Sequence, residues 1–166
     1  MKLEVILLND ISLDLNLLME ALDIFSVKLA SIRRKNIMEK AYNPIRKQYS
    51  AEKLLKDLYL EKKEDLLLAL TDKDIYVEGL NFIFGLALPS FKSCIVSFSR
   101  LKSEDDRIFK ERIFKEIVHE LGHIFGLEHC ENRRCIMYFA NSIEDVDYRF
   151  KGLCEKCLKK LRYDFL

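Results

Sequence analysis

All three histidines of this 166-residue chain lie in one short stretch, His119-Glu-Leu-Gly-His123-Ile-Phe-Gly-Leu-Glu-His129. On a helix, His119 and His123 project from the same face and can bind one metal ion. Gly126 accepts positive φ, which lets the helix end and the chain turn back with His129. Three protein ligands leave one zinc position open for water, so the stretch predicts a catalytic zinc site.

Glu120 follows the first of these histidines and is predicted to be the catalytic residue. Its carboxylate can act as general base on a zinc-bound water and pass the proton to the leaving amine. The spacing H-E-x-x-H-x-x-G-x-x-H resembles that of metzincin peptidases. We therefore predict a zinc metallopeptidase, a hydrolase that cleaves the peptide bonds of a peptide or protein substrate.

Four of the five cysteines follow the last histidine in two close pairs. They are Cys130, Cys135, Cys154 and Cys157. Close-paired thiolates in a chain without a secretion signal predict a tetrathiolate structural zinc site. The alternative is two disulfides, which an oxidising compartment would favour. The fifth cysteine, Cys94, lies in an apolar run and is expected to be a small buried hydrophobic residue.

The histidine and cysteine groups together resemble the archaemetzincin family of zinc metallopeptidases. The resemblance is carried by residues 119–137 and the C-x-x-C pair at Cys154 and Cys157, and the segment 70–85 extends it upstream. It implies two zinc ions, a catalytic one held by the three histidines and a structural one held by the four cysteines. It also implies that Glu120 is the general base and that Met137 forms a turn beneath the catalytic metal.

Alternating strand and helix patterns indicate an α/β fold with a mixed sheet. Strands are predicted over 3–8, 25–29, 66–70, 80–88 and 95–98. Helices are predicted over 13–22 with Ser12 as cap, from Ser50 onward, from a Ser103–Asp106 capping box to about Phe125, and from Ser142 through the last cysteines. The charged segment 31–49 is expected to be an exposed connection.

The resemblance sharpens this into a metzincin-like architecture with a twisted mixed sheet, a long active-site helix and a small helical C-terminal part. We expect one catalytic domain over 1–166. Residues 1–126 would form the sheet-bearing upper part with the active-site helix, and 127–166 the lower part with the methionine turn and the four-cysteine zinc. An extended substrate is expected to pair with 80–88 if that strand is a sheet edge; an inner strand is the alternative. Tyr138 and Phe139 follow the methionine turn and could line a substrate pocket, but core packing is favoured for both.

The amino-acid composition argues against nucleic acid and membranes as partners. The 28 basic and 27 acidic residues nearly cancel, and no basic patch interleaved with aromatic residues points to nucleic acid. The N-terminus resembles no signal peptide and no apolar run reaches bilayer length, so we expect a cytoplasmic protein with no membrane partner.

Two other functions fit parts of the pattern. A peptide-binding module could keep both zinc ions with little or no hydrolytic activity, but binding alone does not need Glu120. A purely structural zinc protein would close its site with a fourth protein ligand, which three histidines do not supply.

Overall fold

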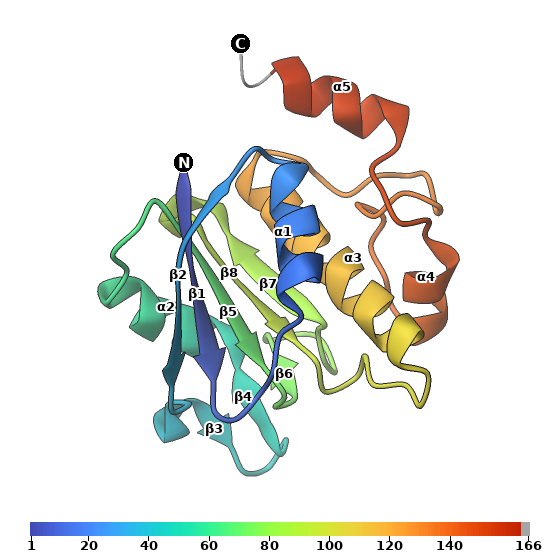
Figure 1. The fold of residues 1–166 in the computed structure, drawn as a ribbon. Coiled ribbons are helices and arrows are strands. Elements are labelled where there is room, and N and C mark those ends of the chain that lie inside the picture. Colours follow the sequence, from blue (N-terminus) through green and yellow to red (C-terminus); the bar gives the residue numbers. More distant parts are fainter. Residues whose placement is uncertain (164–166) are drawn as a thin grey trace.

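The computed structural model describes residues 1–163 and shows a layered α/β fold built on a five-stranded sheet (Figure 1). The strand order is β2-β1-β5-β8-β7. The strands are β1 (Lys2–Leu8), β2 (Lys28–Lys35), β5 (Leu66–Thr71), β7 (Gly85–Leu88) and β8 (Ser93–Ser97). Neighbouring strands are parallel from β2 to β8, and β7 is antiparallel to β8. The mixed sheet confirms the predicted fold class.

Helices cover both faces of this sheet, which is why its inner strands are continuous apolar runs. On one face lie α1 (Leu15–Asp23) and α3 (Asp106–Ile124), and on the other lies α2 (Ala51–Leu60) (Figure 1). The alternation of side chains along β1 sorts the core into two halves. Leu3, Val5 and Leu7 belong to the half with α1 and α3, whereas Ile6 and Leu8 belong to the half with α2.

Smaller elements complete the fold. A second sheet joins β3 (Tyr42–Asn43), β4 (Gln48–Ser50) and β6 (Ile75–Tyr76). Single helical turns lie at Glu39–Ala41 and Pro89–Phe91. The C-terminal region contains α4 (Ile143–Tyr148) and α5 (Glu155–Tyr163), so the helical region expected after Ser142 is two separate helices. Both lie on the α3 side of the large sheet (Figure 1).

Two helices begin at aspartates instead of the predicted serines. Asp14 caps α1 and accepts a hydrogen bond from the Leu17 backbone N–H at 3.1 Å, so the prediction of Ser12 was wrong. Asp105 caps α3, while the Ser103 hydroxyl accepts from the Asp105 backbone N–H. A carboxylate both satisfies a free N–H and interacts with the positive end of the helix dipole. The Ser50 and Ser142 caps are confirmed.

The predicted strand at 25–29 was placed too early, and 31–49 is not a simple connection. Phe25 and Val27 are buried in the turn after α1, and the strand starts at Lys28. The charges of Arg33 and Lys35 had suggested a loop. They lie on an edge strand, where charged side chains protect against further pairing, and both are paired with Glu61.

The predicted strand at 80–88 is shorter than expected but does lie at a sheet edge. Only Gly85–Leu88 forms β7, and the residues before it form a loop with an isolated bridge between Ile75 and Ile83. Because β7 pairs with β8 on one side only, no strand within residues 1–163 occupies its outer edge. The alternative of an inner strand is therefore wrong.

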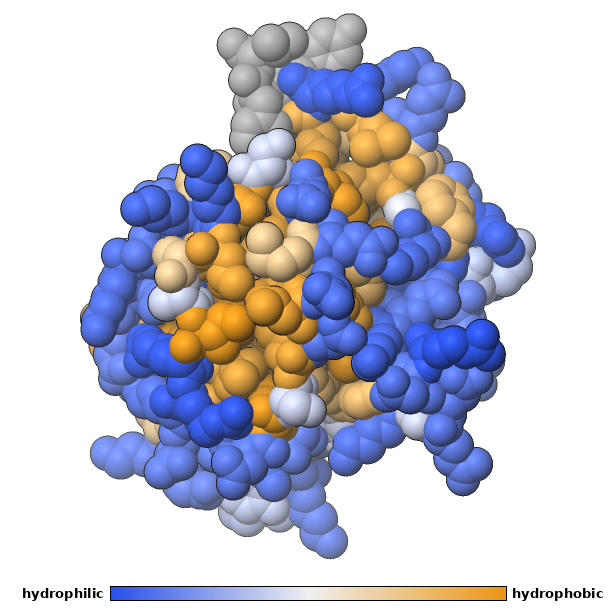
Figure 2. Space-filling model, viewed as in Figure 1, coloured by the Kyte–Doolittle hydropathy of each residue, from blue (hydrophilic) through white to orange (hydrophobic). Residues whose placement is uncertain are grey.

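The surface on the α1 side mixes apolar and charged areas. Figure 2 shows apolar side chains across the centre of this face, surrounded by hydrophilic ones. Leu15 and Met19 of α1 and Ile32 of β2 are among the exposed large hydrophobic residues. Within residues 1–163, no helix is both long and apolar enough to cross a membrane.

Candidate active site

The last two turns of α3 and the turn that follows bring the three histidines together. His119 and His123 lie one helical turn apart, as their spacing predicted. Gly126 has φ of 86°, and the Leu127 N–H returns to the Gly122 carbonyl at 2.9 Å, which ends the helix. His129 then lies beside the other two, with one ligand nitrogen of each within 4.8 Å of the others.

Backbone carbonyls fix the ring orientation of two of these histidines. The His119 Nδ1 lies 2.8 Å from the Ile136 carbonyl, and the His123 Nδ1 lies 2.8 Å from the Leu127 carbonyl. A carbonyl can only accept, so each Nδ1 carries the proton and each Nε2 presents a lone pair. The two Nε2 atoms are 3.1 Å apart. Two lone pairs at that distance repel unless a cation lies between them, so the residues fit a metal ion.

Burial keeps these imidazoles neutral, which is the form that binds metal. It lowers the pKa of His119 well below the usual value, and the nearby Arg149 charge lowers it further. Burial also lowers the pKa values of His123 and His129. At neutral pH the site therefore offers three uncharged nitrogen ligands without first losing a proton.

Glu120 is buried beside the histidines and faces strand β7. Burial, together with the neighbouring Glu116 carboxylate, raises its pKa well above the usual value. A Cβ atom on Gly85 would lie 2.7 Å from the Glu120 Oε1, so only glycine leaves room for this carboxylate. The free edge strand and the carboxylate thus meet at one point of the site.

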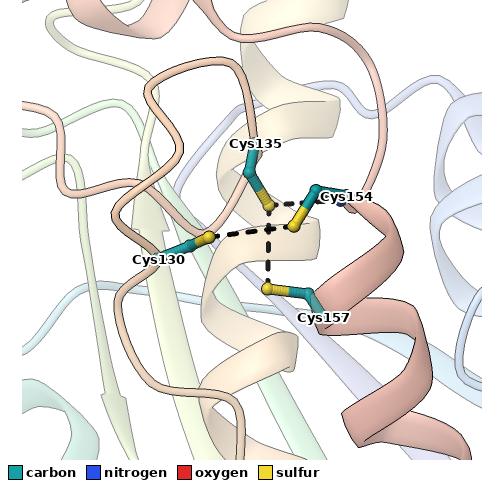
Figure 3. Close-up of side chains that lie close together, drawn as sticks. All are labelled: Cys130, Cys135, Cys154 and Cys157. Atoms are coloured by element: carbon teal, nitrogen blue, oxygen red, sulfur yellow. Dashed lines mark hydrogen bonds between the residues drawn. The ribbon is translucent and has the colours of Figure 1, made fainter.

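The four cysteines converge on a second centre (Figure 3). Cys130 and Cys135 come from the loop after His129, Cys154 directly precedes α5, and Cys157 lies on α5. The Sγ atoms of Cys130 and Cys154 are 3.8 Å apart, as are those of Cys135 and Cys157. Tetrahedral zinc with Zn–S bonds of about 2.3 Å separates its sulfurs by roughly 3.8 Å. A disulfide would need about 2.05 Å, so the geometry disfavours the two-disulfide alternative.

The two centres share one loop. The Cys130 N–H donates to the Met137 carbonyl at 2.9 Å, and His129 directly precedes Cys130. Cys135 and Met137 are both completely buried, and Met137 packs below α3 against Gly122. The thiolate cluster therefore anchors the segment that carries His129 and the methionine turn.

A cleft of about 670 Å³ opens over the histidine centre. One wall is β7 with the loop before it, the floor is the last turns of α3, and the other wall is the segment after the methionine turn. His119, Glu120, His123 and His129 all line it. The cleft therefore brings the edge strand β7, the three histidines and the Glu120 carboxylate into one site.

Comparison with known proteins shows which family has this arrangement of histidines and cysteines. The family model described as Peptidase family M54 matches residues 6–163. An archaemetzincin from Nanoarchaeum equitans is 43% identical over 156 residues, which cover 93% of this chain and 86% of that protein. The chain belongs to the archaemetzincins, peptidase family M54.

Solved archaemetzincin structures share the whole fold. The crystal structure of an archaemetzincin from Methanopyrus kandleri has a TM-score of 0.90 and 36% identity, covering 99% of this chain and 95% of that chain. A zinc-dependent peptidase from Methanocorpusculum labreanum has a TM-score of 0.85 and 29% identity, covering 96% and 99% respectively. Membership of this archaemetzincin family confirms the prediction of a zinc metallopeptidase acting on peptides. The histidine and cysteine clusters match the predicted pair of zinc ions, one catalytic and one structural.

The archaemetzincin cleft also contains residues that the sequence placed elsewhere or did not single out. Core packing was favoured for Phe139, but the alternative of a pocket residue is the correct one: it is exposed, lines the cleft and lies with its ring centroid 5.0 Å from that of His129. Glu116 and Arg149 also line the cleft as a buried ion pair. Glu116 precedes Glu120 by one helical turn, a spacing that could have revealed it. Arg149 lies in a charged stretch that gives no such signal.

A substitution at Gly122 would test the packing of α3 against Met137 in the methionine turn. A Cβ atom there would lie 2.5 Å from the Met137 Sδ, and Met137 is completely buried. We expect Gly122→Ala to lower Tm by several degrees and to weaken zinc binding. Overpacking a core typically costs about 1–3 kcal/mol, whereas alanine gains only about 1 kcal/mol of helix propensity. Thermal melts and zinc titration measure both effects.

The matched control for this variant is Gly152→Ala. Gly152 is not in a helix, and its added Cβ atom would meet only the Phe150 ring at 3.3 Å. It should change Tm less than Gly122→Ala and leave zinc binding intact. Equal behaviour of the two variants would contradict the packing argument.

Proposed function

We propose that His119, His123 and His129 hold the catalytic zinc, and that Cys130, Cys135, Cys154 and Cys157 hold the structural zinc. The observation that carries the first assignment is the pair of Nε2 lone pairs 3.1 Å apart, each fixed by a carbonyl on the other ring nitrogen. Carbonyl partners of this kind commonly orient metal-binding histidines. The second assignment rests on the four sulfurs that surround one point.

We further propose that Glu120 is the general base and later the general acid of peptide hydrolysis. Zinc, when bound, lowers the pKa of water toward neutrality and polarises a carbonyl group. The Glu120 carboxylate accepts a proton from the attacking water and delivers it to the departing amine nitrogen. Burial raises its pKa, which favours the protonated form and so suits the second of these tasks.

The substrate is proposed to lie extended along the free edge of β7. Gly85 and Ala87 line the cleft, and the strand can offer its outer N–H and C=O groups to a peptide backbone. The whole chain would then act as one catalytic domain. Residues 1–126 supply the upper wall and the active-site helix, and 127–166 supply the lower wall with the thiolate cluster.

The proposed cellular location is a reducing compartment such as the cytoplasm, because four metal-binding thiolates must stay reduced. The balanced charge supports peptides over nucleic acid as partners. A module that only binds peptides would not need a buried carboxylate beside the three histidines, so hydrolysis is the better proposal.

Two measurements on the purified protein test this function. Elemental analysis is expected to find two zinc ions per chain, since the ligands divide into three histidines and four thiolates. A peptide library is expected to be cleaved by the zinc-loaded protein and to stay intact after chelation. Fewer than two zinc ions with oxidised cysteine pairs would overturn the tetrathiolate site. Two zinc ions without any cleavage would favour the peptide-binding module.

A further inference from the structure

Arg149 lines the cleft but takes no part in the hydrolysis proposed above. It directly follows α4, and only 1% of its side chain is exposed. Its Nη1 donates to the Glu116 Oε1 at 2.9 Å, so the pair links α3 to the chain after α4. This ion pair accounts for one of the five N–H donors of the guanidinium group.

The other edge of the guanidinium group has no protein partner. The Arg149 Nε is buried and makes no hydrogen bond within the described residues. Its Nη2 likewise has no hydrogen-bond acceptor among residues 1–163. Buried donors without partners are rare, because they lose water without gaining another bond. The buried Arg149 Nε therefore lacks an acceptor, which residues 1–163 do not supply, and Nη2 lies beside it on the same edge of the guanidinium group.

Two other arginines of this chain show what that edge binds when it is occupied. Arg100 holds both carboxylate oxygens of Asp74 with its Nε and Nη2, at 2.9 and 2.8 Å. Arg112 holds Asp147 in the same way, at 2.8 and 2.7 Å. The planar fork of arginine matches the two oxygens of a carboxylate. In Arg149 the same fork holds no carboxylate within residues 1–163, although the residue lines the cleft.

We propose that Arg149 is a specificity residue that binds a carboxylate of the peptide substrate through its Nε–Nη2 edge. The proposal rests on the proposed function, because it assumes a peptide in the cleft beside Glu120. The carboxylate belongs either to an aspartate or glutamate side chain near the scissile bond or to the free C-terminus of a short peptide. Glu116 orients the fork through Nη1 and leaves the other edge open.

The test compares twin peptides that differ only in charge. One pair carries glutamate or glutamine at each position near the cleavage site, and a second pair has a free or an amidated C-terminus. The zinc-loaded wild type is expected to cleave the carboxylate twin roughly 10- to 100-fold faster in kcat/KM, the range given by hydrogen bonds to a charged group. The pair that shows this preference identifies the source of the carboxylate.

The informative variant is the double change Glu116→Gln with Arg149→Met, which removes the buried ion pair without leaving one charge unpaired. It is expected to cleave both twins at similar rates. Arg112→Met is the matched control, because Arg112 also links α3 to α4 but its fork is already filled by Asp147. The Arg112→Met control should keep the preference for the carboxylate twin. Both variants are compared only as folded protein that contains two zinc ions.

Calorimetric binding of the same peptides separates this proposal from the proposed function. A carboxylate preference in binding that disappears in the double variant supports Arg149 even if no peptide is cleaved. Cleavage by the wild type with equal rates for both twins would overturn the role of Arg149 and leave the peptidase intact. A preference that persists in the double variant would place the carboxylate elsewhere, for example on the metal, and would also overturn it.

Discussion

Replacement of Glu120 by alanine or glutamine is expected to abolish detectable peptide hydrolysis while zinc stays bound. In the proposed site the three histidines supply the metal ligands, so this side chain is not needed to hold the zinc. Its carboxylate is needed to move a proton from water to the leaving nitrogen, and loss of a positioned acid–base group typically costs about 10²–10⁴-fold in rate. Zinc content and peptide cleavage should be measured on the same preparation.

Glutamine tests the proton transfer most directly, because it keeps the volume of the buried side chain next to Gly85. Glu104→Gln is a suitable control, since Glu104 is an exposed carboxylate before α3 and lies outside the cleft. The control should cleave peptides at the wild-type rate. A Glu120 variant that cleaves as fast as wild type would show that another group is the base.

Loss of one thiolate from the cluster is expected to be the most destabilising single change. Cys154→Ser or Cys157→Ser should lower Tm more than His119→Ala does. A structural zinc contributes on the order of 10 kcal/mol of apparent binding energy, which the fold depends on. The cluster joins the loop after His129 to α5, whereas His119 lies within a helix that other core contacts hold (Figure 3). Thermal melts of the purified variants measure the difference.

Cys94→Ala is the matched control for this prediction. Cys94 is completely buried in β8 but is not part of the cluster. Its replacement removes a thiol without removing a zinc ligand, so two zinc ions should remain and Tm should fall less. If the cluster variants melt at the same temperature as His119→Ala, the structural role of the second zinc would have to be withdrawn.

The metal-binding residues could be predicted because their spacing is local. His119 and His123 needed only the period of a helix, and His129 needed only the turn at Gly126. The cysteines also form pairs that are close in sequence, and two such pairs without a secretion signal already favoured one tetrathiolate site. Strands β1 and β5 were predictable because helices cover both of their faces, which requires apolar side chains on both.

Features that depend on distant residues were not predictable. Arg149 lies 33 residues from Glu116, so no local pattern in the sequence relates the two. The strand at Lys28–Lys35 was displaced for the same reason, because Glu61 pairs with its charges from another element. For Phe139 the sequence left the core and a substrate pocket open and favoured the core because the residue is hydrophobic, whereas the structure places it in the cleft.

The loop shared by both metal centres ties the position of one to the position of the other. His129 is covalently next to Cys130, and the Cys130 N–H is bonded to the carbonyl of Met137. A shift of the thiolate segment would therefore move His129 and the methionine turn with it. Damage to the cysteine cluster would in this way reach the catalytic centre without touching any histidine.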